Sequence, residues 1–173
     1  MCTGNICRSP MGEALLRAHL RARGVDAHVH SAGTLAWGGP ATANAVRTMH
    51  EHGLSIDGHV SRALTDDLVA GADIVLGMTR DHVWRATRAD DDADSRTFLV
   101  GELARLGATV GARDDGEDVR MWAARVARVR PGGPVGRVGD EIDDPVGEPL
   151  SVYRATAVRL DRDLAAIAAL LAP

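Results

Sequence analysis

Two residue types that can break a phosphate ester stand close together at the start of the sequence. Cys2 and Arg8 are separated by five residues, in a run that reads Cys-Thr-Gly-Asn-Ile-Cys-Arg-Ser-Pro. A loop of this length can curl around a phosphate with its N–H groups pointing inward, and Arg8 can bind two phosphoryl oxygens at once. We therefore predict a phosphate-binding loop from Cys2 to Arg8. Its candidate substrate-binding residues are Thr3, Gly4, Asn5, Ile6, Cys7 and Ser9.

Cys2 is the predicted nucleophile. A helix is predicted to start at Ser9, with Pro10 at its first position, so the loop runs into a helix N-terminus. Such a terminus and a cationic neighbour can lower a cysteine pKa from about 8.5 to between about 3.5 and 7.5. Ser9 can donate a hydrogen bond to the resulting thiolate, and Asn5 can hold the loop in shape.

Cys7 is open to two interpretations, ordinary burial or a reversible disulfide with Cys2 that protects the nucleophile from over-oxidation. Two cysteines are too few for a disulfide framework, and both lie in one loop. So few cysteines, both in one loop, favour a reducing compartment, and we find no signal peptide before Cys2. We expect a cytoplasmic protein.

The leaving oxygen of a phosphate ester needs a proton, and Asp144 is the candidate general acid. It precedes Pro145, which restricts Asp144 to extended conformations and can aim its side chain over the site. Asp143 is the rival, and the sequence does not separate the two.

The elements that must position these residues alternate between helical stretches and short β-like runs. This alternation predicts an α/β fold with a parallel sheet, in a single domain over residues 1–173. Strands are predicted at 27–31, 73–78 and 97–100. Helices are predicted from Ser9 to Gly24 and at 41–52, 117–129 and 150–171, with shorter helices after Thr65 and Thr79.

Composition limits the partners. The net charge is −4, which gives no electrostatic reason to expect nucleic acid, and no apolar run approaches the length of a membrane span. The acidic run at 90–94 is interpreted as a solvated loop and not as a metal site. We expect no metal and no cofactor.

The chain resembles the low-molecular-weight protein tyrosine phosphatase family. The similarity is strongest at Cys2 to Pro10 and continues in Ser-Ala-Gly-Thr at 31–34, His-Val-Ser-Arg at 59–62, Ala-Asp-Ile-Val-Leu at 72–76, Met-Thr at 78–79 and Asp144-Pro145. The resemblance implies a three-layer αβα fold with a four-stranded parallel sheet. It also implies phosphotyrosine-containing protein substrates and a cognate bacterial tyrosine kinase as a partner. By resemblance, Cys2 is the nucleophile, Arg8 binds phosphate, Asp144 is acid and then base, Asn5, Ser9, Ser31 and His59 support the loop, and Trp37 lines the substrate cleft.

Three features concern the position within the family. Val146 and Gly147 follow Asp144-Pro145, where family members usually carry aromatic residues, so a weak aromatic clamp is expected. Protein-arginine phosphatases resemble this family but typically have threonine in place of Ile6, which favours phosphotyrosine here. Arsenate reductases share the fold but need further cysteines, and this chain has only Cys7 besides Cys2.

The segment before Cys2 is unusual for the family, which has an apolar central strand there. Only Met1 precedes Cys2 in this sequence, and an internal GTG valine codon is easily taken for a start. We therefore expect the true start to lie upstream. The alternative is a truncated, inactive phosphate-binding relative. In the chain from Met1, the strands near Val29 and Ile74 are expected to be held apart or to pair abnormally, with the Met1 ammonium near the thiolate.

Overall fold

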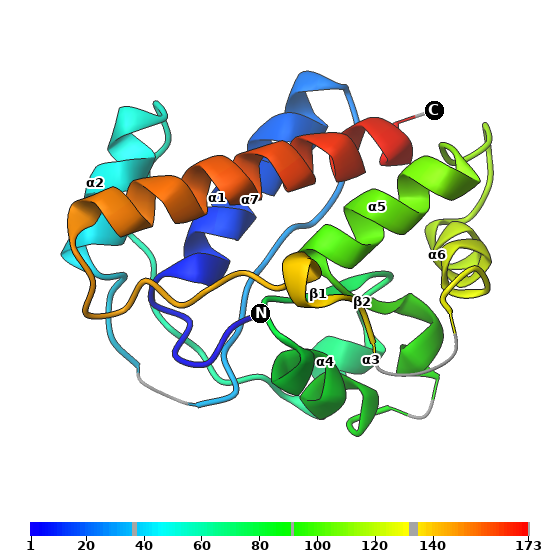
Figure 1. Ribbon diagram of the computed structural model, residues 1–173, viewed down its shortest axis with the longest axis horizontal. Coiled ribbons are helices and arrows are strands. Elements are labelled where there is room, and N and C mark those ends of the chain that lie inside the picture. The colour runs from blue at the N-terminus through cyan, green and yellow to red at the C-terminus, as the bar shows by residue number, and fades with distance from the viewer. Residues whose placement is uncertain (36–37, 91, 132–134, 173) are drawn as a thin grey trace.

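The computed structural model describes residues 1–35, 38–90, 92–131 and 135–172. Helices surround a small parallel sheet, as the α/β prediction requires (Figure 1). The long helix α7 (Leu150–Leu171) packs across α1 (Arg8–Ala22) and α5 (Val100–Val110) on one side of the sheet. Helices α3 (Asp66–Ala70) and α4 (Arg80–Thr87) lie on the other side.

The predicted helices begin within two residues of their expected starts. Thr42 caps α2 (Ala43–Glu51) and Thr65 caps α3, each by accepting a backbone N–H bond on its side chain. Asp118 caps α6 (Val119–Ala127) in the same way. The first helix starts one residue earlier than predicted, at Arg8, with Cys7 as its N-cap residue. Short 3-10 helices cover Ala93–Arg96 and Val138–Asp140.

The sheet is parallel, but only two strands form a regular ladder among the described residues. Strand β1 (Val75–Gly77) pairs with β2 (Thr97–Leu99), with Val75 opposite Thr97. The predicted strand at 27–31 is not formed, which corrects that prediction. A strand needs a hydrogen-bonded neighbour along its length, and here only single parallel bridges, from Gly33 to Cys2 and to Ala63, continue the sheet.

Met1 and Cys2 lie between the two segments that were expected to be held apart. The Met1 ammonium donates to the Leu76 carbonyl, and the Met1 carbonyl accepts from Met78 N at 3.2 Å. On the other side, Cys2 N donates to the Ala32 carbonyl at 3.4 Å. A cavity of about 70 Å³, lined by Met1, His30, Ala32 and residues 74–76 among others, lies at this position. Met1 and Cys2 therefore bridge the space between these two segments at the end nearest the phosphate loop.

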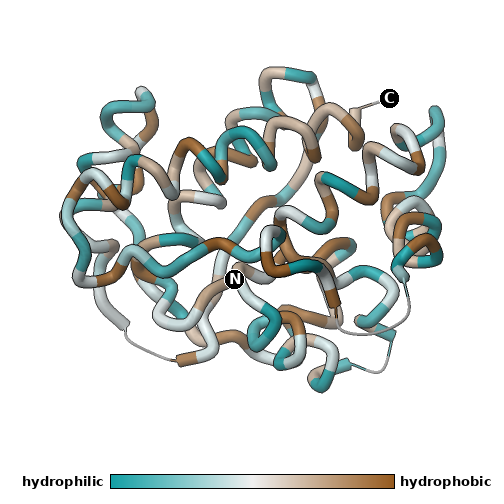
Figure 2. Tube along the Cα trace, viewed as in Figure 1, coloured by the Kyte–Doolittle hydropathy of each residue, from teal (hydrophilic) through white to brown (hydrophobic). Residues whose placement is uncertain are grey.

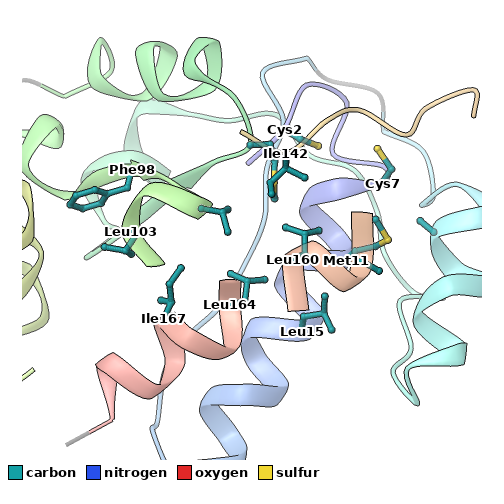
Figure 3. Packing of buried hydrophobic residues seen from close by; sticks show 14 of the residues in the cluster. Cys2, Cys7, Met11, Leu15, Phe98, Leu103, Ile142, Leu160, Leu164 and Ile167 are labelled. Carbon is teal, nitrogen blue, oxygen red and sulfur yellow. The ribbon is translucent and has the colours of Figure 1, made fainter. Parts of the chain in front are cut away.

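The hydrophobic core lies between the sheet and the α1–α7 layer. Figure 2 shows hydrophobic segments gathered along and beside the strands. Figure 3 shows α1 and α7 meeting side chain to side chain in this core, with β2 and α5 contributing from the sheet side. The buried residues that carry this packing are Met11, Leu15, Phe98, Leu103, Leu160, Leu164 and Ile167. This packing fixes the start of α1, and therefore the end of the loop that precedes it.

Two other segments differ from expectation. Helix α5 was not predicted, because it follows directly from β2 at Val100 without a turn signal between them. In the acidic run, Asp90 is not simply solvated, since it forms an ion pair with the buried guanidinium of Arg96. Across the described part of the chain, no group of His, Cys, Asp and Glu side chains is arranged to hold a metal ion. None of the described helices is long and apolar enough to cross a membrane.

Candidate active site

The loop from Cys2 to Cys7 directs its carbonyl groups outward. Every carbonyl in it accepts a hydrogen bond from a donor outside the loop, whereas the N–H groups of residues 3–7 have no acceptor among the described residues. Backbone N–H groups bind four of these carbonyls: Thr34 binds that of Cys2, Leu35 that of Thr3, Thr42 that of Ile6 and Met11 that of Cys7. Two side chains bind the others: Ser61 Oγ binds the Gly4 carbonyl and His59 Nε2 binds the Asn5 carbonyl. A ring of N–H groups left facing inward is the arrangement that binds an anion.

Cys2 is 1% exposed and lies against the start of α1 (Figure 3). Its Sγ is 3.0 Å from Ser9 Oγ. Interaction with the Cys7 thiol, hydrogen bonds from Ser9 and the nearby Met1 ammonium together lower the pKa of Cys2 to about 5, although burial opposes them. A pKa of about 5 favours the ionised form of Cys2 at neutral pH, and the thiolate is the nucleophilic form of a cysteine.

Asn5 organises the loop from inside. It is fully buried and adopts a positive φ of 52°, a left-handed conformation that asparagine tolerates better than most residues. Its Oδ1 accepts from Arg62 N at 3.0 Å, so its Nδ2 must be the donor to Ser9 Oγ and Ser31 Oγ, each at 2.8 Å. Because Ser9 accepts from Asn5, its own hydroxyl hydrogen is free to point at the Cys2 sulfur.

The predicted support residues Ser31 and His59 both reach the loop, by the bonds to Asn5 given above. Sequence reasoning missed Glu13, which accepts from Ser31 Oγ at 2.7 Å and so completes the chain of hydrogen bonds. It also assigned no role to Arg62, whose Nε donates to the Ser31 carbonyl at 2.8 Å. The available signal was the position of Glu13, five residues after Arg8 on the predicted first helix.

Arg8 and Asp144 come together although 136 positions separate them. Arg8 Nη2 donates to Asp144 Oδ2 at 2.5 Å, and Nη1 donates to the Ile142 carbonyl at 3.0 Å. Arg8 is 3% exposed, and its buried Nε has no partner among the described residues. Asp144 is 45% exposed at its side chain. The rival Asp143 is exposed, and the described hydrogen bonds and ion pairs of the site include Asp144 and not Asp143.

Cys7 also contacts Asp144. Its thiol donates to Asp144 Oδ1 at 3.6 Å, and both cysteines are free thiols. The Cys2 thiolate, burial and the Asp144 carboxylate raise the pKa of Cys7, so this second sulfur stays protonated. Cys2 and Cys7 thus have opposite protonation states within one loop.

One histidine in contact with the loop was not found from the sequence. His82 lies in the first turn of α4, is 4% exposed, and its Nε2 lies 3.1 Å from Thr3 Oγ1. The predicted cleft residue Trp37 lies outside the described residues. Leu35 and Val146, on the segments that flank the loop and Asp144, are exposed by 53% and 50%.

Comparison with known proteins identifies a family and several relatives with similar sequences. A family model described as low molecular weight phosphotyrosine protein phosphatase matches residues 1–105. The tyrosine phosphatase Etp of Escherichia coli K12 is 38% identical over 107 residues, which are 59% of this chain and 67% of Etp. The protein-arginine-phosphatase of Bacillus subtilis is 45% identical over 83 residues, which are 47% of this chain and 55% of that protein.

Solved structures extend the similarity beyond residue 105. A crystal structure of a YwlE mutant from Bacillus subtilis has a TM-score of 0.73 at 28% identity, covering 97% of this chain and 93% of that one. The Erwinia amylovora tyrosine phosphatase AmsI has a TM-score of 0.73 at 27% identity, covering 99% of this chain and 90% of that one.

An α/β fold in which a Cys-x5-Arg loop enters a helix defines a class of phosphatases with a cysteine nucleophile. This chain belongs to the low molecular weight phosphotyrosine protein phosphatase family, which is a family of phosphoric monoester hydrolases. The family membership and the fold predicted from the sequence are confirmed, although the described residues form two regular strands in place of the expected four.

Proposed function

We propose that the chain is a protein tyrosine phosphatase that hydrolyses phosphotyrosine through a phosphocysteine intermediate on Cys2. The observation that carries this proposal is the loop in which all carbonyls are bonded outward while the N–H groups of residues 3–7 are left for an anion. A phosphoryl group brings three oxygens that need donors of this kind.

The first chemical step transfers the phosphoryl group to sulfur. The Cys2 thiolate attacks phosphorus, an S–P bond forms and the P–O bond to tyrosine breaks. Asp144 gives its proton to the departing tyrosine oxygen, which leaves as the neutral phenol. Inward N–H groups and Arg8 stabilise the charge that collects on the other phosphoryl oxygens, which is the usual source of a large rate gain.

The second step returns the enzyme to its starting state. A water molecule attacks the phosphocysteine, Asp144 takes a proton from that water, the S–P bond breaks and inorganic phosphate leaves. Asp144 is then protonated again and Cys2 is again a thiolate, so one cycle consumes one phosphotyrosine and one water. These steps use the side chains and backbone N–H groups of the chain and water. Ser9 stabilises the leaving thiolate through its hydrogen bond to Cys2, and Asn5 holds Ser9 in place.

Arg8 is suited to a phosphoryl ligand for a further reason. Its buried Nε has no hydrogen-bond partner among the described residues. A buried donor left without an acceptor lowers the stability of the fold by about 1–3 kcal/mol or more. A phosphoryl oxygen would pair with it. Asp144, which binds Arg8 at 2.5 Å, is then freed to face the leaving group.

Phosphoarginine is the alternative substrate, and one observation favours considering it. The Bacillus subtilis protein-arginine-phosphatase has 45% identity over the part that aligns, higher than the 38% of Etp. Ile6 argues for phosphotyrosine instead, because protein-arginine phosphatases resembling this family typically have threonine there. We expect protein substrates in the cytoplasm, with a cognate tyrosine kinase as the opposing enzyme.

The test compares substrates at one concentration of purified protein. Phosphotyrosine peptides should be hydrolysed with a high KM, phosphoserine peptides should react poorly, and Cys2→Ser should abolish turnover. Faster hydrolysis of phosphoarginine than of phosphotyrosine would assign the chain to the arginine-specific branch. Turnover by Cys2→Ser at the normal rate would contradict the mechanism.

A further inference from the structure

Helix α4 carries a histidine whose tautomer the backbone determines. The N–H of Thr79 lies 3.1 Å from Nδ1 of His82, and a backbone N–H can only donate. Nδ1 is therefore the acceptor, and a neutral imidazole with Nδ1 unprotonated carries its hydrogen on Nε2. The Thr79 hydroxyl lies 2.7 Å from the same Nδ1 and shares this single acceptor with the backbone N–H.

The hydrogen on Nε2 points at the phosphate loop. Nε2 of His82 lies 3.1 Å from Oγ1 of Thr3, so His82 is the donor and the Thr3 hydroxyl is the acceptor. Burial is the largest cause that lowers the pKa of His82, to about 4, and the Met1 ammonium and Arg8 act in the same direction while Asp144 opposes them. The imidazole is therefore neutral at pH 7 and the direction of this hydrogen bond is fixed.

Thr3 is the residue directly after the nucleophile. Its carbonyl is bonded to Leu35 N at 3.0 Å, so the backbone on that side is attached to the segment after Gly33. Its side chain is attached to α4 through His82. Thr3 is thus held on both its carbonyl and its side chain, from two different parts of the fold, as Asn5 is by its own partners.

We propose that His82 is a positioning residue for the nucleophile, acting through its hydrogen bond to Thr3. It keeps the Cys2–Thr3 peptide in the orientation that places the sulfur at the centre of the loop and turns the Thr3 N–H inward. His82 does not touch the substrate. The proposal rests on the proposed function of Cys2, and it adds α4 to the elements that control the site.

The test is a double-mutant cycle of Thr3→Val and His82→Asn. Thr3→Val keeps the shape of the side chain and removes the acceptor, and His82→Asn keeps an acceptor for Thr79 but cannot reach Thr3. Each single change is expected to lower kcat for an aryl phosphate by about three- to tenfold, the worth of one hydrogen bond. The double variant should be no slower than the slower single variant, because both changes remove the same bond.

Conservative variants separate positioning from general structural damage. Thr3→Ser keeps the hydroxyl and His82→Gln keeps a donor near the position of Nε2, so both should retain most of the wild-type kcat. His50→Asn, on the exposed histidine that pairs with Asp57, is the matched control and should leave kcat unchanged. Thermal unfolding of every variant reports whether the fold is intact.

The rate at which iodoacetate alkylates Cys2 provides a second readout that does not need turnover. If the wild-type chain hydrolyses no phosphate ester, the proposed function fails, and the same cycle on the alkylation rate still tests the positioning role. The proposal would be overturned if the fold-losses of the two single variants, in kcat or in the alkylation rate, multiplied in the double variant. A wild-type rate for folded His82→Asn would overturn it as well.

Discussion

The Asp144 carboxylate lies 2.5 Å from the Arg8 guanidinium, across 136 positions of sequence. In the proposed reaction both groups are needed, one for the leaving oxygen and one for the phosphoryl oxygens. Their contact means that a phosphoryl ligand competes with Asp144 for Arg8. The ion pair therefore links ligand binding to release of the general acid.

Asp144→Ala should separate catalysis from binding. We expect kcat for substrates with poor leaving groups to fall about 10²–10⁴-fold, the usual worth of general acid catalysis. Arg8 no longer has a competing carboxylate in this variant, so inorganic phosphate should inhibit more strongly. The measurements are kcat across a series of aryl phosphates and the inhibition constant of phosphate.

Asp143→Ala is the matched control for that experiment. Asp143 is exposed and its neighbour makes the contact to Arg8, so this change should cost far less activity and leave phosphate inhibition unaltered. Equal losses from the two changes would remove the distinction between the aspartates.

The pH dependence of Cys2 alkylation follows from its lowered pKa. The thiolate is the reactive form, so the rate with iodoacetamide should rise as pH increases through about 5 and then level off. Cys7→Ala removes the largest cause of the shift and should move the midpoint to higher pH. Ser9→Ala should move it in the same direction by less. A midpoint near 8.5, the ordinary value for cysteine, would show that the loop does not stabilise the thiolate.

The same shift has a consequence for stability. The Cys2 pKa is lower in the folded state than in the unfolded state, so the thiolate stabilises the fold at alkaline pH, and this contribution is lost as pH falls through about 5. Between about pH 5 and the unfolded pKa, the free energy of unfolding should therefore rise with pH more steeply in the wild type than in Cys2→Ser. Chemical denaturation at several pH values measures the difference.

Gly33 lies against the outer face of the loop, where there is no room for a side chain. A Cβ at this position would lie 2.5 Å from the Thr3 carbonyl oxygen and 2.9 Å from Asn5 N. Gly33→Ala should therefore displace the loop, lower activity and destabilise the fold by about 1–3 kcal/mol. Gly58→Ala, where nothing lies within 4 Å, is the control and should change neither quantity appreciably. Wild-type activity in Gly33→Ala would mean that the loop tolerates the displacement.

Substrate choice between tyrosine and arginine can be tested at Ile6. Ile6→Thr introduces the residue typical of the arginine-specific relatives, so the ratio of kcat/KM for phosphoarginine to that for phosphotyrosine should increase. Thr3→Ser, in the same loop, should leave the ratio unchanged. A ratio unaltered by Ile6→Thr would show that other residues determine specificity.

The loop and most of the helices, α5 excepted, could be predicted because their signals are local. Cys-x5-Arg followed by Ser-Pro, and a threonine directly before a helix, as at Thr65 and Thr79, each act within a few residues. The absence of a regular strand at 27–31 could not be read from that segment, because strand formation depends on a neighbour, and Met1–Cys2 provides only a single bridge. Contacts such as His82 with Thr3 bring together residues 79 positions apart, which no local pattern encodes.

The identity of the nucleophile is the central claim, and trapping its intermediate tests it most directly. The wild-type chain is mixed with an aryl phosphate, quenched in acid within one turnover, digested and examined by mass spectrometry. We expect one phosphoryl group on the peptide that contains Cys2, attached to Cys2 and absent from the Cys2→Ser protein treated in the same way. Turnover of the substrate with no phosphoryl group on Cys2 at any quench time, or with the group on Cys7, would contradict the proposed mechanism.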